Sequence, residues 1–136
     1  MSGPNPELRK VREETVQRHI DTELAGDVDG AIGTFAPGRV SYDVPAIGRL
    51  MLTEDEVREY LTDFVETTRD RHMAVIHLHH SDDAVIAEVE LDIVELDQRN
   101  RDSTSGVRTK SRHCVIFRFD GDQLWQEASY GGAVTV

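Results

Sequence analysis

The 136-residue sequence contains a single cysteine, Cys114, and it has no apolar run long enough to cross a bilayer. One cysteine cannot form an internal disulfide. Strand alternation places Cys114 on the outward face of its strand, and we expect it to have a structural role only. The N-terminal residues also lack the apolar stretch of a secretory signal. We therefore expect a cytoplasmic protein with no membrane partner.

Positive charge is also scarce. Lysine and arginine total 15 against 26 acidic residues, which gives a net charge of -11 and a pI of about 4.8. Such a surface repels phosphate backbones and anionic lipids, so we expect no nucleic-acid partner, whereas neutral or cationic small molecules stay possible. The length fits one domain, predicted at residues 7–136 after a disordered tail at residues 1–6.

The first half of the chain is helical in pattern. Apolar residues spaced at helical intervals predict a helix from Glu7 to Ala25, with Gly26 ending it. Asp27 can cap a short second helix that runs up to Pro37-Gly38, before a strand from Arg39 to Val44. Thr53 and Glu56 form a capping box at the start of a third helix. The apolar stripe of that helix contains Val57, Tyr60, Leu61, Phe64 and Val65.

The second half alternates as strands do. The predicted strands are His72 to Ser81, Val85 to Leu96, Val107 to Phe119 and Leu124 to Val134. Asp120-Gly121-Asp122 predicts a tight turn, and the polar stretch from Asp97 to Gly106 predicts a hairpin loop. Helices followed by strands predict an α+β fold with an antiparallel sheet.

Four titratable side chains share the inward faces of these elements: His19, His72, His113 and Asp43. Burial and a charged partner can shift such pKa values into the range useful for proton transfer, so the group suggests a lined pocket. Alternatively, each histidine is a hydrogen-bonded core residue, and Asp43 caps the turn into Pro45.

The roles of other polar residues can also be interpreted in two ways. Tyr130 and Gln126 share the predicted inward face of the last strand, where they either bind a substrate oxygen or are satisfied within the core. His77 and His79 share an outward face with Glu88 and Glu90 nearby, but these acids pair more simply with arginines across the sheet. We predict no metal site.

The order of elements from Val11 to Gly131 resembles the nuclear transport factor 2-like superfamily, and within it the ketosteroid isomerase and SnoaL-like cyclase branches. The resembling segments are Val16-Gln17-Arg18-His19, Ala25-Gly26-Asp27-Val28-Asp29-Gly30, Ser41-Tyr42-Asp43, Val57-Arg58-Glu59-Tyr60 and Ile116-Phe117-Arg118-Phe119-Asp120-Gly121. The resemblance implies a cystatin-like α+β barrel, a cone of three helices and a curved antiparallel sheet around one apolar pocket. It also implies a homodimer.

The resemblance assigns roles to single positions. Asp43 stands where ketosteroid isomerases have their general base, and His19 stands at the place of an oxyanion-binding tyrosine. Val115 replaces the second oxyanion donor, and valine donates no hydrogen bond. His72 matches the histidine of the dehydratase branch, while the cyclase acid falls in Tyr130-Gly131-Gly132, where no acid is present.

The sequence thus predicts cofactor-independent proton transfer on a small hydrophobic organic molecule, as an isomerase, dehydratase or cyclase. Asp43 or His72 is the predicted base, with His19 as hydrogen-bond donor. The predicted substrate contacts are His113, Tyr130, Gln126, Tyr60, Phe64 and Val115. The alternative is a non-catalytic domain of the same fold that binds a small ligand or forms a dimer.

Overall fold

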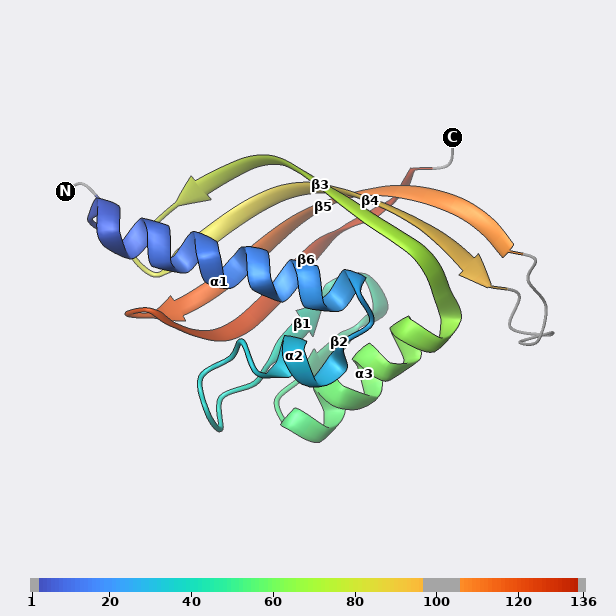
Figure 1. Ribbon diagram of the computed structural model, residues 1–136, viewed down its shortest axis with the longest axis horizontal. Helices are drawn as coiled ribbons and strands as arrows, with labels where there is room; N and C mark the ends of the chain where they lie inside the picture. The colour runs from blue at the N-terminus through green and yellow to red at the C-terminus, as the bar shows by residue number, and fades with distance from the viewer. Residues whose placement is uncertain (1–2, 97–105, 135–136) are drawn as a thin grey trace.

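The computed structural model describes residues 3–96 and 106–134, and it confirms an α+β architecture (Figure 1). Its helices are α1 (Pro6–Leu24), α2 (Val28–Ile32) and α3 (Glu54–Thr67), with a short 3-10 helix η1 (Pro45–Ile47). Its strands are β1 (Tyr42–Val44), β2 (Arg49–Met51), β3 (Thr68–His80), β4 (Ala84–Leu96), β5 (Gly106–Asp120) and β6 (Gln123–Val134). The predicted loop at 97–105 lies outside the described residues. No helix in the described ranges is long and apolar enough to span a membrane.

The helix ends follow local capping chemistry. Asn5 accepts a hydrogen bond from the Leu8 amide, so α1 begins at Pro6, within the stretch predicted as a tail. The Thr53 hydroxyl accepts from the Glu56 amide, which confirms the predicted cap of α3. α2 is shorter than predicted, because the chain leaves the helix after Ile32.

The strands form one sheet in the order β2-β1-β6-β5-β4-β3, and the sheet is mixed rather than purely antiparallel. β1 pairs with β6 in parallel and with β2 in antiparallel register. The sequence predicted neither the parallel pair nor β2, because three-residue strands are too short for a readable alternation. β6 therefore lies inside the sheet, between β1 and β5.

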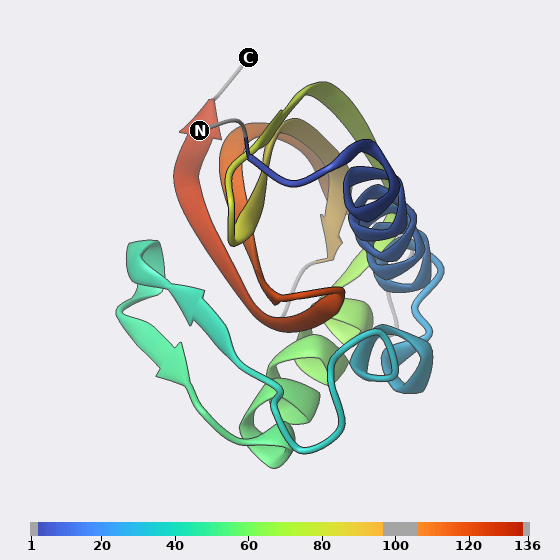
Figure 2. The same cartoon turned by 90° about the vertical axis from the view of Figure 1, so that its left-hand side faces the viewer.

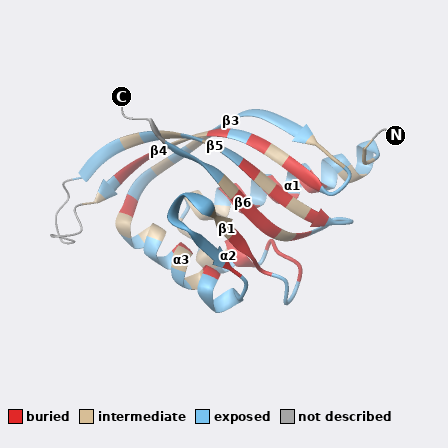
Figure 3. Cartoon of the chain, turned by 180° about the vertical axis from the view of Figure 1, so that it is seen from behind, coloured by how far each residue is buried: buried red, intermediate tan, exposed pale blue. Residues whose placement is uncertain are grey.

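The sheet curves, and α1 lies along its concave side while α2 and α3 lie below (Figures 1 and 2). The core occupies this concave side, where buried bands cross β4, β5 and β6 (Figure 3). Its best-buried apolar side chains come from both layers: Val16, Ile20, Val57, Leu61, Val85, Ala87, Val89, Phe117 and Leu124. The predicted inward faces of β4 and β5 are confirmed by this burial pattern.

Bulges shift the alternation of β3 and β6. Phe119 pairs with Leu124 and Arg118 with Gln126, so Trp125 is an extra residue on β6. Two similar shifts occur on β3, between Arg69 and His72 and between Val75 and His77. Each extra residue turns the following side chains to the other face of the sheet.

Arg12 ties two turns of the sheet to α1. Its side chain is 2% exposed, and its guanidinium donates to the carbonyls of Gly121 (2.9 Å), Ser81 (3.3 Å) and Asp82 (3.0 Å). The same group lies over the Phe119 ring, 5.3 Å from its centre. One buried cation thus supports the β3–β4 and β5–β6 turns together.

We expect Arg12→Leu to lower the free energy of unfolding by about 2–4 kcal/mol, because the variant leaves buried carbonyls without donors. Urea denaturation followed by circular dichroism measures the change. The matched control is Arg18→Leu, an exposed arginine of the same helix, with an expected change within about 0.5 kcal/mol. Equal stability of the two variants would contradict the role of Arg12.

Candidate functional site

A cavity of about 130 Å³ lies between the concave side of the sheet, the end of α1 and α3. Most of its wall is carbon, supplied by aliphatic and aromatic side chains. The lining residues are Glu23, Leu24, Tyr42, Val44, Ala46, Tyr60, Leu61, Phe64, Met73, Val89, Leu91, His113, Val115, Glu127, Ser129 and Gly131. The cavity is therefore apolar, with two carboxyl groups in its wall.

His19 lies behind this wall and is completely buried. The Thr34 hydroxyl donates to the Ala31 carbonyl (2.6 Å), so its oxygen accepts from Nδ1–H of His19 at 2.7 Å. Helix α1 turns His19 inward because it falls on the same stripe as Val16 and Ile20. The contact with Thr34 fixes the ring and leaves Nε2 facing the cavity cluster.

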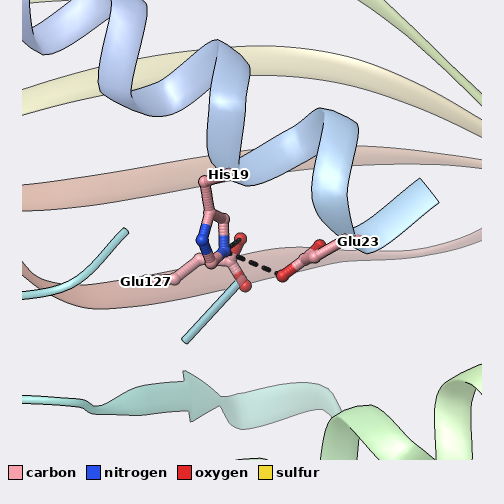
Figure 4. A group of neighbouring side chains, drawn as sticks. All are labelled: His19, Glu23 and Glu127. Atoms are coloured by element: carbon pink, nitrogen blue, oxygen red, sulfur yellow. Dashed lines mark ion pairs between the residues drawn. The ribbon is translucent and has the colours of Figure 1, made fainter. Parts of the chain in front are cut away.

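Nε2 of His19 faces a phenol and two carboxylates. Tyr42 Oη is 2.7 Å away, Glu23 Oε1 2.8 Å and Glu127 Oε1 3.4 Å. Figure 4 shows both carboxylates converging on the imidazole, Glu23 from the same helix and Glu127 from β6. Because the Tyr42 hydroxyl donates to Glu23, its oxygen accepts a hydrogen from Nε2. Both ring nitrogens are thus donors, as in an imidazolium ion.

The charges of this cluster shift its proton affinities. Burial alone would lower the pKa of His19, but the charges and hydrogen bonds of Glu23 and Glu127 outweigh it and raise the pKa to about 10. Burial, with the charge of Glu23, raises the pKa of Glu127 to about 7, against the opposing effect of His19. Burial also raises the pKa of Tyr42 well above its usual value. Near neutral pH, Glu127 can therefore both accept and release a proton.

Two more titratable groups line the cavity. Burial raises the pKa of Tyr60 to about 12, so its phenol is a neutral hydrogen-bonding group. Burial lowers the pKa of His113, whose Nε2 lies 2.7 Å from Ser111 Oγ. Burial thus favours the uncharged imidazole of His113.

The structure brings some of the predicted site residues together. His113, Tyr60, Phe64 and Val115 line the cavity, and His19 contacts Tyr42, which also lines it. Their roles in substrate binding stay predictions.

Tyr130 and Gln126 do not point into the cavity, because the bulge at Trp125 reverses the predicted alternation of β6. Gln126 instead contacts Ser41 and Arg118, and Tyr130 is 42% exposed.

The inward orientations predicted for Asp43 and His72 are wrong. On β1 the neighbours Tyr42 and Val44 line the cavity, and the side chain between them, Asp43, turns to the other face. The His72 side chain is 66% exposed and pairs with Asp70 at 2.8 Å. The bulge before His72 places it opposite Asp92, on the outward face of β4.

Sequence reasoning missed Glu23, Glu127 and Tyr42. Glu23 could have been predicted from the sequence, since it follows His19 by four residues and therefore lies on the same face of the helix. Glu127 and Tyr42 carried none, because the bulge in β6 and the brevity of β1 hide their orientation. Of the four titratable residues predicted to line a pocket, His113 lines this cavity, together with Glu23 and Glu127, which were not predicted.

A metal ion could be held by His19, Glu23 and Glu127, whose ligand atoms lie within 4.8 Å of one another. The hydrogen bonds described above already occupy these atoms. Among the described residues, the one buried side-chain polar atom without a partner is His80 Nδ1, on the far part of β3. The outward pair His79 and Glu88 forms an ion pair at 2.8 Å instead of a metal site.

The curved sheet packed by three helices, with a cavity on its concave side, has the α+β fold of solved nuclear transport factor 2-like proteins. Residues 16–127 match the SnoaL-like domain family, and the chain belongs to this family. No curated protein matches the sequence closely enough to add an activity.

Solved structures agree on the fold. A putative polyketide cyclase from Xanthomonas campestris superimposes with a TM-score of 0.75 at 17% identity, covering 90% of this chain and 91% of that one. A nuclear transport factor 2-like protein from Anabaena variabilis gives 0.75 at 15% identity, with 98% and 96% covered. A hypothetical protein with a ketosteroid isomerase-like fold from Catenulispora acidiphila, in complex with trimethylamine, gives 0.68 at 14% identity, with 86% and 84% covered. At these identities the likeness concerns the fold.

Proposed function

We propose that the protein is a small-molecule enzyme that moves a proton between atoms of an organic substrate without a cofactor, as an isomerase or lyase. The observation that supports this most is Glu127, a buried carboxyl in the wall of an apolar cavity, with a pKa of about 7. A general acid–base group works best when its pKa lies near the working pH. The family and its cyclase-like structural relatives favour the same class of reaction.

The neighbouring side chains supply the rest of the chemistry. Glu127 would take the proton, while the phenol of Tyr60 would donate a hydrogen bond to a substrate oxygen as it gains negative charge. His19 would act behind the wall, because its imidazolium holds Glu23 and Glu127 in place. Glu127 thus replaces Asp43 and His72 as the proposed base, since these two side chains point away from the cavity.

The volume of the cavity limits the size of the substrate. An apolar protein cavity of roughly 150 Å³ holds benzene, and this one measures about 130 Å³. The part of the substrate that enters is therefore about the size of one six-membered ring. A small hydrophobic ligand and a homodimer stay predictions, as does the cytoplasmic location.

Deuterium exchange tests the proposal. Cyclohexanone in D₂O exchanges the hydrogens beside its carbonyl, and NMR follows the rate with and without protein. We expect catalysed exchange that saturates with ketone concentration. A panel of monocyclic ketones that bind without faster exchange would favour the non-catalytic ligand-binding domain instead.

A cavity-filling variant connects the activity to the site. Ser129 lines the cavity, and Ser129→Met would place two more heavy atoms there on a longer, flexible side chain. We expect loss of ketone binding in NMR titrations, together with loss of exchange, while the circular dichroism spectrum is kept. Exchange that persists in this variant would place the reaction elsewhere. The control is Thr62→Met, at an exposed position of α3, which should keep both ketone binding and exchange.

A further inference from the structure

The cluster behind the cavity has more negative than positive charge. His19 carries one positive charge, shared between Glu23 at 2.8 Å and Glu127 at 3.4 Å. Both carboxylates reach the cavity wall, with exposed side-chain fractions of 13% and 11%. When both are ionised, one negative charge next to the cavity has no counter-ion.

No lysine or arginine is among the described residues that line the cavity. Two arginines lie beside the wall without lining the cavity. The Arg49 guanidinium is 5.7 Å from the centre of the Tyr60 ring, and Arg71 donates to the Leu24 carbonyl at 3.0 Å and lies 6.0 Å from the centre of the Phe64 ring. Burial lowers the pKa of His113, which favours its uncharged form. Within residues 3–96 and 106–134, His19 is the one cation that pairs with Glu23 and Glu127, so a cation that enters the cavity would be attracted to the second carboxylate.

The aromatic side chains of the wall favour an organic cation over a metal ion. Tyr42, Tyr60 and Phe64 present aromatic side chains to the cavity, and the Tyr42 and Tyr60 rings lie 5.9 Å apart. Aromatic faces attract alkylammonium groups, and they recognise quaternary ammonium ligands in other proteins. A metal ion would need several further oxygen or nitrogen ligands, whereas much of the lining is hydrocarbon, as at Leu24, Val89 and Leu91.

We propose that the cavity binds an alkylammonium cation, with its charged head group beside Glu23 and Glu127 and its carbon substituents against Tyr42, Tyr60 and Phe64. This inference rests on the proposed function and specifies its substrate class, an organic amine or quaternary ammonium compound. The cation also supports the reaction, because its charge keeps Glu127 in the ionised form that accepts a proton.

Choline and 3,3-dimethyl-1-butanol test the proposal, since they have nearly the same shape and differ in charge. Calorimetric or NMR titration at pH 8 compares their dissociation constants. We expect choline to bind about tenfold more tightly or better. The preference should disappear in Glu127→Gln and be retained in Glu14→Gln, a matched charge change at an exposed position of α1.

Several outcomes would overturn the inference. These are equal affinities for the two probes, an unchanged preference in folded Glu127→Gln, and displacement of choline by micromolar Zn²⁺, which would assign the carboxylates to a metal. Ketone exchange without a preference for choline would reject this inference alone. A preference for choline without any exchange would reject the proposed enzyme and leave the cation site standing.

Discussion

Glu127→Gln should reduce ketone exchange by about a hundredfold or more, which is the usual contribution of a general acid–base group. The amide keeps the shape of the side chain but cannot accept a proton. Exchange rates of wild type and variant, measured by NMR at saturating ketone, give the ratio. Glu14→Gln, with the same change in charge on the exposed face of α1, should keep the full rate.

The free energy of unfolding of Glu127→Gln distinguishes loss of the proposed base from misfolding of the variant. Because burial disfavours the ionised Glu127 carboxylate, its replacement by a neutral amide should cost little free energy of unfolding at pH 8. A folded Glu127→Gln protein that exchanges ketone at the wild-type rate would remove Glu127 from the mechanism. A variant with both lower stability and lower rate would need Glu127→Asp as a second measurement, since aspartate restores the carboxyl.

Stability should fall as pH rises, and His19 is the main reason. Its pKa rises from 6.5 in the unfolded chain to about 10 in the folded protein. The folded state therefore binds the proton more tightly, so the stabilisation is complete below pH 6.5 and is lost as pH approaches 10. Glu127 acts in the same direction between about pH 4.5 and 7, because its folded pKa is also raised.

The groups that face His19 and Glu127 come from four elements. They are Glu23 from α1, Tyr42 from β1, Tyr60 from α3 and, on β5, His113 at the cavity wall. Urea denaturation from pH 5 to 10 measures the free energy of unfolding. A stability that is constant or rises over this range would contradict the imidazolium assignment of His19.

His19→Leu should lower the free energy of unfolding by about 3–5 kcal/mol at pH 8, because it leaves two buried carboxylates without their cation. At pH 5 the loss should be smaller, since Glu127 is then protonated. The matched control is His72→Leu, because the His72 side chain is 66% exposed and its loss should cost within about 0.5 kcal/mol. Equal losses at both pH values would indicate a packing effect alone.

Sequence patterns predicted the long, regular parts of this fold. β4 and β5 alternate without interruption through their buried halves, so the orientations of Val89, Val115 and His113 followed from parity. α3 followed from its capping box and apolar stripe, and His19 followed from the stripe of α1. These features are local, and neighbouring residues in the sequence determine them.

The site residues were harder to predict, because the orientations of their side chains depend on pairing between strands that are far apart in the sequence. One extra residue, Trp125, turns Glu127 toward the cavity and Gln126 away from it, and no glycine or proline marks that bulge. Tyr42 rather than Asp43 faces the cavity because β1 is placed by its parallel pairing with β6. The resemblance to ketosteroid isomerases predicted Asp43 as the base. In the structure the bulge in β6 turns Glu127 toward the cavity instead.

The position of β6 has a consequence for folding order. β6 follows every other strand in the sequence, yet it separates β1 from β5 in the sheet. Tyr42 and Glu127 can therefore come together only after the chain from β2 through β5 has been synthesised. Strands β1 and β6, which are far apart in the sequence, must then pair. A nascent chain that still lacks β6 has His19 and Glu23 but not Glu127, so the cluster around the imidazole can be completed only after the last strand has been made.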